Sequence, residues 1–314
     1  MITGLEFNRS FDRHMFLFLL AAMGVGGFLG EHLAPYRNLV PWLFAYMTFT
    51  TSLQCSWHEF LHVARKPGPV LMILGILHIV LPAVAIVCGR ACYPENPDLV
   101  AGFVLAAAIP IGVTSAIWTG LAAGEVPLAL SAITIDTLLS PLVTPLVLLI
   151  FLGRTVTLDM SALMIDLTQM IVFPAMLGLT LHDLSGGGLY KVAVPYLGPP
   201  SRICLAMVIA INLATVRHVI LGASINLPLL LVFTEFVVIL GFVLGQLGPR
   251  LIGCSRARTT AVIYSVGIRN LSAGLIIAAD HFPALTILPL VLAMLFQQPT
   301  AALAHRFLSR HSPD

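Results

Sequence analysis

Charged side chains are scarce in this sequence. Only 10% of its 314 residues are Asp, Glu, Lys or Arg, whereas 58% are hydrophobic, and the mean hydropathy is +0.98. A soluble domain is about one quarter charged, because water must solvate its surface. The shortage of charge therefore excludes an ordinary soluble protein and predicts that most of the exterior faces lipid.

Other absences narrow the range of functions. The sequence has no GxxxxGK[ST] loop, so we do not expect pumping driven by ATP. The net charge is only +2 and the basic residues form no stripe, which argues against a nucleic-acid partner. The five cysteines are odd in number and lack CxxC spacing, so they indicate neither a zinc site nor a disulfide framework. We expect no cofactor and no obligate protein partner.

Long hydrophobic runs are abundant instead. Because a membrane helix needs about 20 apolar residues, these runs predict an all-α polytopic membrane protein with ten transmembrane helices. The expected spans are residues 14–31, 38–56, 68–89, 97–123, 126–152, 158–181, 198–218, 224–248, 257–280 and 283–308. The first run follows Glu6 and Asp12 and has no clear cleavage site, so we expect it to be retained rather than removed as a signal peptide.

Basic residues other than Arg269 divide unevenly between the two membrane faces. With both termini on one face, as an even number of spans requires, that face carries eleven Lys and Arg residues and the other carries four. Loops on the cytoplasmic side of a membrane are enriched in these residues. The distribution therefore predicts a protein of the cell membrane with both termini in the cytoplasm.

Five spans lie on either side of Gly153 and suggest an internal repeat. An odd number of helices in each repeat makes the two repeats inverted relative to each other. The expected repeats are residues 1–153 and 154–314 of one transporter domain, 1–314. The fourth and ninth spans then correspond, and both contain helix-breaking residues, at 109–115 and 265–270. Unwound backbone in a membrane is tolerated where it packs in protein or lines a wet cavity, although two ordinary kinks are the alternative.

Ionisable side chains inside the spans are the first candidates for a site, because each costs about 2.5–3.5 kcal/mol to insert. They are His78, Asp136, Asp166, Glu235 and Arg269. Arg269 cannot shed its proton, so it needs a carboxylate of the protein or of a substrate. Asp136 lies at a matching depth, and a static Asp136–Arg269 pair that only fixes helix packing is one interpretation. His78 is either a packing residue or a proton carrier.

The run His58-Glu59-Phe60-Leu61-His62 has the spacing of a zinc-protease motif. Asp98 could be offered as a third metal ligand, but one full membrane crossing separates it from the two histidines. Arg65 and Lys66 follow within a turn, which favours a helix at the cytoplasmic interface. We therefore expect a transporter and not an enzyme.

The sequence resembles the bile acid:sodium symporter family, within a superfamily that includes arsenite efflux permeases, over residues 13–308. The most specific segments are Pro110–Ser115, Asp136–Pro145, Val266–Asn270 and Pro289–Gln298. The resemblance implies ten helices in two inverted five-helix repeats, with a panel domain of spans one, two, six and seven and a core domain of the other six. Spans four and nine would be broken and would cross at their breaks, beside the substrate cavity.

The sodium ligands that the resemblance implies are missing here. Sodium-coupled members have Asn, Glu and Gln where this sequence has Ala116, Ser265 and Arg269. Hydroxyl ligands of the fifth span align with Ala129 and Ile133. The resemblance therefore implies a divergent member, in which the Arg269 guanidinium replaces the positive charge of sodium.

Together these features predict a secondary active transporter of a small organic anion that works by alternating access and is sodium-independent or proton-linked. Arg269 would hold the anion or release it to Asp136 in another state. The residues expected along the substrate and ion pathway are Thr114, Ser115, Asp136, Arg269, Asn270 and His78. The alternatives are a sodium-coupled bile acid or organic anion symporter with relocated sodium ligands, and an efflux permease for another solute.

Overall fold

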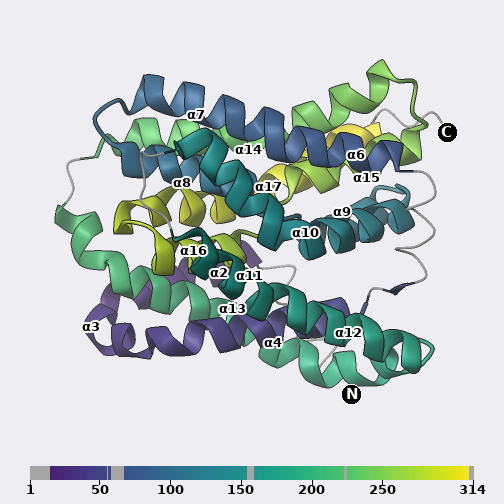
Figure 1. Ribbon diagram of the computed structural model, residues 1–314, viewed down its shortest axis with the longest axis horizontal. Coiled ribbons are helices and arrows are strands. Elements are labelled where there is room, and N and C mark those ends of the chain that lie inside the picture. Colours follow the sequence, from purple (N-terminus) through teal and green to yellow (C-terminus); the bar gives the residue numbers. More distant parts are fainter. Residues whose placement is uncertain (1–14, 55, 58–66, 154–158, 223–224, 311–314) are drawn as a thin grey trace.

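The computed structural model describes residues 15–54, 56–57, 67–153, 159–222 and 225–310. Every regular element in these ranges is a helix, which confirms the all-α class (Figure 1). Six helices are long and apolar enough to cross a membrane, so the chain is a multi-pass membrane protein. They are Gly68–Cys92, Val126–Leu152, Met160–Leu184, Pro195–Thr215, Leu227–Leu251 and Ala284–Leu308.

One group of helices, here called the panel, occupies the lower half of Figure 1. It contains α2 (Met15–Phe28), α3 (Gly30–Leu33), η1 (Ala34–Leu39), α4 (Val40–Ser52), α11 (Met160–Leu167), η4 (Thr168–Val172), α12 (Phe173–Leu184) and α13 (Gly188–Gly222). Helix α13 packs along α2 and α4, and α12 packs on the other side of the group against α4.

The remaining helices form a second group, here called the core group. It contains α6 (Gly68–Gly75), η2 (Ile76–Val80), α7 (Leu81–Cys92), α8 (Pro97–Ala108), α9 (Thr114–Leu121), α10 (Val126–Leu152), α14 (Leu227–Leu251), α15 (Arg256–Gly267), α16 (Leu271–His281), η5 (Ala284–Thr286) and α17 (Ile287–Arg310). Helix α14 packs against α15 and α17, and α8 packs against α7 and α17.

Two short helices are enclosed at the centre of the core group. Every residue of α8 from Leu99 to Ala108 is buried, as is every residue of α15 from Thr259 to Gly267. A helix that is buried on all sides must be apolar on all sides or have its polar groups paired. Glycine allows close packing here, because a Cβ added at Gly245 of α14 would meet the Cα of Ile263 at 2.8 Å.

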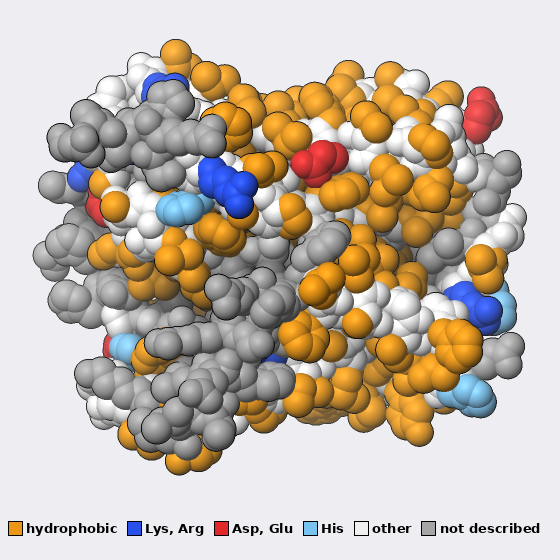
Figure 2. Space-filling view, turned by 180° about the vertical axis from the view of Figure 1, so that it is seen from behind, with side chains coloured by type: hydrophobic (Ala, Val, Ile, Leu, Met, Phe, Trp, Pro, Cys, Tyr) orange, Lys and Arg blue, Asp and Glu red, His pale blue; other side chains and the backbone are white. Residues whose placement is uncertain are grey.

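The outer surface is apolar. Figure 2 shows hydrophobic side chains spread over the face opposite to that of Figure 1, with few charged side chains between them. Large examples from several helices are strongly exposed, such as Phe28 at 86%, Phe173 at 68% and Val232 at 69%. Such a surface is stable against lipid, where apolar side chains need no burial by protein.

Helix α13 is longer than the seventh expected span, because it includes part of the loop expected before residue 198. It begins at Gly188, well before the expected start at residue 198. Gly186 and Gly187 have φ of +59° and +76°, the left-handed region that favours glycine, so the turn is complete before the helix starts. The helix then continues through three prolines, which remove backbone donors without ending it.

Two side-chain contacts join the panel to the C-terminal end of α16. Arg37 of η1 bonds Asp280 at 2.7 Å and the carbonyl of Ala279 at 2.6 Å. His281 bonds Asp166 of α11 at 2.7 Å. The panel therefore holds one end of α16, while the other end of this helix meets the interrupted segments described next.

Candidate functional site

Two helices of the core group are interrupted where they meet. Residues 109–113 separate α8 from α9, and residues 268–270 separate α15 from α16. The two connecting segments run antiparallel and pair at Ile111 and Arg269. This region is here called the crossing. Its hydrogen bonds run from Gly112 N–H to Ile268 O at 2.9 Å and from Asn270 N–H to Pro110 O at 2.8 Å.

Glycine is required at position 112 for the chains to approach this closely. A Cβ added to Gly112 would lie 2.7 Å from the carbonyl oxygen of Arg269, a contact that real Cβ atoms essentially never make. The preceding Pro110 cannot donate to a helix hydrogen bond, so it favours the break at this point. The sequence of the first segment thus both ends α8 and admits the second segment.

A carboxylate supports the first segment of the crossing. Asp136 of α10 is fully buried, and its Oδ2 accepts from the backbone N–H of Ile111 at 2.8 Å. Its Oδ1 lies 2.7 Å from Nε2 of His78. His78 belongs to η2, a π-helical turn between α6 and α7, and such turns are frequent at functional sites. Both oxygens of Asp136 are therefore engaged.

A neutral amide supports the second segment. Gln297 of α17 accepts from the backbone N–H of Arg269 at 2.7 Å, and its side-chain amide donates to the Arg269 carbonyl at 3.1 Å. Gln297 is buried. Each segment of the crossing is thus hydrogen-bonded by one deep polar side chain from a long helix, α10 on one side and α17 on the other.

The Arg269 side chain is buried, with 7% of its surface exposed. Its two terminal guanidinium nitrogens have no hydrogen-bond partner among the described residues, and the ion pairs of the described ranges do not include one between Arg269 and Asp136. Asp136 nevertheless bonds Ile111, the residue that pairs with Arg269, so both charged side chains belong to the same buried region. Arg269 lies between the C-terminal end of α15, whose dipole favours a positive charge, and the N-terminal end of α16, whose dipole opposes one.

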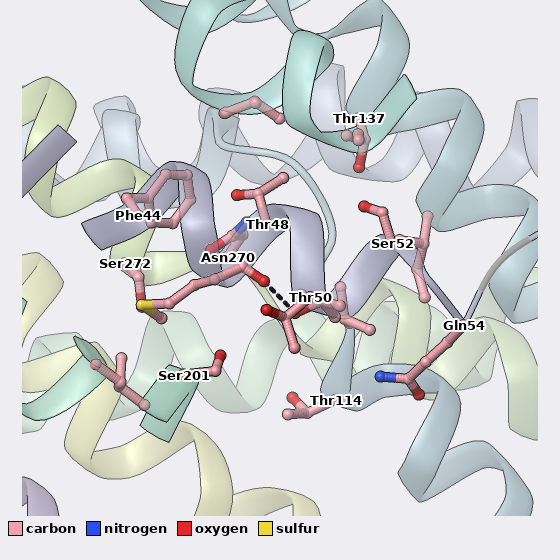
Figure 3. A pocket seen from close by; sticks show the side chains of 18 of the residues that line it. Phe44, Thr48, Thr50, Ser52, Gln54, Thr114, Thr137, Ser201, Asn270 and Ser272 are labelled. Atoms are coloured by element: carbon pink, nitrogen blue, oxygen red, sulfur yellow. Dashed lines mark hydrogen bonds between the residues drawn. The ribbon is translucent and has the colours of Figure 1, made fainter. Parts of the chain in front are cut away.

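A cavity of about 430 Å³ lies between the panel and the core group, next to the crossing (Figure 3). Helices α4, α12 and α13 line one side, and α9, α10, α16 and α17 line the other. Its polar lining residues are Thr48, Thr50, Thr51, Ser52, Gln54, Thr114, Thr134, Thr137, Tyr190, Ser201, Asn270, Ser272, Gln297 and Gln298. Its charged lining residues are Arg202 and Arg269, and no described lining residue is Asp or Glu.

The cavity unites some of the residues expected in the pathway and excludes others. Thr114, Arg269 and Asn270 line it. Asp136 and His78 are not lining residues and are buried beside the crossing. Ser115 is also absent from the lining and is fully buried, so these three side chains cannot touch a solute in the cavity in this conformation.

The hydroxyl groups of α4 and the guanidinium of Arg202 are features that the sequence analysis missed. A run from Thr48 to Ser52 at the end of an apolar stretch was the available signal. Two of its members also bond within the helix, because Thr50 donates to the Tyr46 carbonyl and Thr51 to the Met47 carbonyl. From sequence alone, the run is therefore as consistent with hydrogen bonds inside the helix as with the lining of a cavity.

The other ionisable residues within the predicted spans have local partners. Asp166 bonds His281, and Glu235 accepts from the Thr300 hydroxyl at 2.9 Å. The run His58–His62 lies outside the described residues. Within the described ranges, no group of three or more His, Cys, Asp or Glu residues could hold a metal ion.

Comparison with known proteins agrees with this architecture. The family model "Sodium Bile acid symporter family" matches residues 41–223. YbaS, an uncharacterized protein of Bacillus subtilis (strain 168), is 34% identical over 286 residues, which cover 91% of this chain and 94% of that protein. The chain belongs to the sodium bile acid symporter family. This confirms the family resemblance of the sequence and supports a membrane transporter.

Other relatives of the symporter family carry sodium in their names. The Bacillus subtilis protein named as an uncharacterized sodium-dependent transporter, YocS, is 28% identical over 266 residues, covering 81% of this chain and 80% of that protein. A probable sodium/metabolite cotransporter of rice chloroplasts, BASS1, is 25% identical over 182 residues, covering 58% of this chain and 44% of that protein.

Proposed function

We propose that this member of the family is a secondary active transporter of a small organic anion across the cell membrane, which is sodium-independent or proton-linked. The observation that carries the proposal is the charge of the cavity. Two arginines and many hydroxyl and amide groups line it, and none of its described lining residues is acidic. Donors of this kind bind carboxylate, sulfate or phosphate groups through charge-assisted hydrogen bonds.

Arg269 is proposed to act as a fixed positive charge rather than as a direct ligand of the solute in this conformation. Its terminal nitrogens are buried, so an anion in the cavity would be attracted through space. The hydrogen bonds would come from the lining groups, such as Thr114 and Asn270. The N-terminal ends of α9 and α16 begin at the crossing and add partial positive charge.

Asp136 and His78 are proposed to form the proton-binding pair of a proton-linked cycle. Their side chains are buried, 2.7 Å apart, and attached to the crossing through Ile111. A change in the charge of this pair would act on the backbone of the crossing and on nearby Arg269. In another conformation, Arg269 would release the anion and its side chain would turn toward Asp136; this step is also part of the proposal.

Alternating access in this proposal is movement of the panel against the core group about the cavity. Helices occur within all ten expected spans, and the two interrupted ones fall at equivalent places in residues 1–153 and 154–314. This supports ten crossings in two inverted repeats. The excess of basic residues on one face supports cytoplasmic termini.

Sodium coupling through relocated ligands is the second candidate, and one observation favours it. The hydroxyl groups of Ser115 and Ser265 are buried without a hydrogen-bond partner in the described part of the chain. Ser115 lies in the first turn of α9 and Ser265 in the last turn of α15, next to the interrupted segments, where sodium-coupled relatives would have ligands. The names of YocS and BASS1, which include sodium, also favour this candidate. An efflux permease for another solute is the third.

Uptake into proteoliposomes tests the proposal. Purified protein is reconstituted, and uptake of radiolabelled carboxylates is compared with that of uncharged amides of the same acids. Three conditions are used: an inward sodium gradient, an inward proton gradient and no gradient. We expect selective uptake of an anion that does not depend on sodium. An Arg269→Gln variant should lose about tenfold or more of this uptake, which corresponds to about 1.4 kcal/mol of lost attraction between the fixed charge and the anion.

Arg258→Gln is the matched control, because it removes an arginine charge from the exposed contact with Glu125 within the core group, away from the cavity lining. It should retain uptake. Full uptake by Arg269→Gln would contradict the role given to Arg269. Uptake that requires sodium would support the second candidate, and equal uptake of the neutral amides would support the third.

A further inference from the structure

A second large cavity lies on the far side of the core group from the panel. It measures about 760 Å³ and runs between α14 and α17 over α15. Its floor contains the buried side chains of Phe242 and Ile263. Its rims are exposed and apolar, namely Ile239 (43%) and Val243 (41%) on α14, and Leu303 (51%) and Phe307 (64%) on α17. We call this cavity the α14–α17 groove.

The groove follows one face of each of two membrane helices. Its lining residues on α14 recur at helical spacing from Glu235 to Arg250, a rise of about 22 Å along the helix axis. The hydrocarbon core of a bilayer is about 30 Å thick, so the groove covers much of one side of the membrane. Because the rims are exposed on helices that can cross a membrane, the groove opens sideways toward lipid.

Positive charge gathers at one end of the groove. Arg250 and Arg256 line it there, and both side chains are exposed. The amide oxygen of Gln246, in the orientation that satisfies both groups, accepts from Arg250 at 2.8 Å. Arg256 donates to the Leu308 carbonyl at 2.7 Å. These bonds hold two guanidinium groups at the end of an apolar channel.

The opposite end has a different character. Glu235 lines it and accepts a hydrogen bond from Thr300, and between the two ends most lining side chains are apolar. Both arginines of the described lining lie at the other end, so this end offers no basic group to a second anionic group. An occupant that matches the groove therefore has one anionic head at Arg250 and Arg256 and one apolar tail.

We propose that the α14–α17 groove binds an anionic phospholipid, with the phosphate at Arg250 and Arg256 and one acyl chain along the floor. Guanidinium groups bind phosphate in a bidentate manner, and their charge favours a lipid with net negative charge over a zwitterionic one. A water-soluble anion would leave the apolar rims uncovered. The site is separate from the cavity at the crossing, so it does not depend on the proposed substrate.

Native mass spectrometry of the delipidated full-length protein tests the site. The protein in non-ionic detergent receives equal amounts of phosphatidylglycerol and phosphatidylcholine with identical acyl chains. We expect a one-to-one adduct that favours phosphatidylglycerol by about thirtyfold, because the two arginines near an anionic lipid add roughly 1 kcal/mol each. The Arg250→Gln/Arg256→Gln variant should bind the two lipids equally.

Two further variants separate the head from the tail of the lipid. Arg306→Gln removes a charge from the same end of α17 outside the groove lining, and it should keep the full preference. Val243→Trp fills the groove with both arginines intact, and it should lose the adduct while its melting temperature in lipid-free detergent stays near that of the unmodified protein. Equal binding of the two lipids by the unmodified protein would overturn the proposal. Undiminished lipid binding by Val243→Trp would contradict the placement of the acyl chain along the floor of the groove. Displacement of the lipid by millimolar inorganic phosphate would contradict it too.

Discussion

The two segments of the crossing have similar backbone hydrogen bonding, but the charged group at the first segment is negative and that at the second is positive. Ile111 and Arg269 pair with each other, and each donates its N–H to one buried side chain from the long helix that follows its own half-helix. On the first side that acceptor is the carboxylate of Asp136, which also bonds His78. On the second side it is the neutral amide of Gln297, and the charge is the guanidinium of Arg269 itself.

This difference underlies our proposal that the interrupted pair of helices is held together without a bound cation. A backbone break in a membrane needs acceptors for its freed N–H groups, and both sides have one. The negative charge of Asp136 and the positive charge of Arg269 then balance within the same buried region. In our proposal, the charge of Arg269 takes the place that a sodium ion would otherwise fill beside Asp136.

Among the variants that test this comparison, Asp136→Ala should have the largest effect on stability. It leaves His78 and the Ile111 N–H without their acceptor and Arg269 without its nearby negative charge, so we expect a loss of about 3–5 kcal/mol in the free energy of unfolding. Thermal unfolding in detergent measures it. Asp166→Ala removes the partner of His281 at the same 2.7 Å distance, but Asp166 is 40% exposed. That control should cost about 1 kcal/mol or less, and equal losses would contradict the role of burial.

Gly112→Ala tests the close approach of the two segments. The new Cβ would meet the Arg269 carbonyl, so the segments must separate, at a cost of about 1–3 kcal/mol for an overpacked site. Gly75→Ala is the control, because a Cβ there meets nothing within 4 Å and alanine favours the helix. Both variants can be compared by melting temperature. A Gly112→Ala protein as stable as Gly75→Ala would show that the two segments of the crossing can move apart at lower cost than we infer.

The smallest expected effect is that of Gln297→Ala. It removes two hydrogen bonds to the Arg269 backbone, and such polar contacts in membrane proteins average about 0.6 kcal/mol each, which gives roughly 1 kcal/mol in all. The melting curve should shift by much less than for Asp136→Ala. A loss as large as that of Asp136→Ala would mean that the side chains of Asp136 and Gln297 contribute equally to the free energy of unfolding despite their different charge.

Much of this arrangement follows from sequence, because its signals are local. Pro110 marks the first break, and the unusual depth of Arg269 and Asp136 marks them as candidates. The bond between His78 and Asp136 was not predicted, since it joins residues 58 positions apart whose contact depends on how α10 packs against η2. The long α13 was missed because proline usually indicates a helix end, whereas a membrane helix can continue through it.

The cavity itself was the least predictable part. Hydroxyl groups in an apolar helix such as α4 usually bond to their own backbone, as Thr50 does, and only the packing of the panel against the core group turns their side of the helix toward a cavity. The sequence also could not predict that the terminal nitrogens of Arg269 are buried without a hydrogen-bond partner among the described residues, because a span indicates depth in the membrane but not the direction of a side chain.

The melting temperature of the purified protein in sodium chloride and in matched potassium chloride tests the central claim, that Arg269 stands in for sodium. A ligand of the folded state at a hundredfold excess over its Kd stabilises by about 2.7 kcal/mol, so an occupied sodium site is readily seen. The Ala116→Asn/Ser265→Glu/Arg269→Gln variant restores the ligand types of sodium-coupled relatives and should show a sodium-specific rise. We predict that the unmodified protein gives coincident curves in the two salts. A saturable rise in sodium alone would contradict the claim.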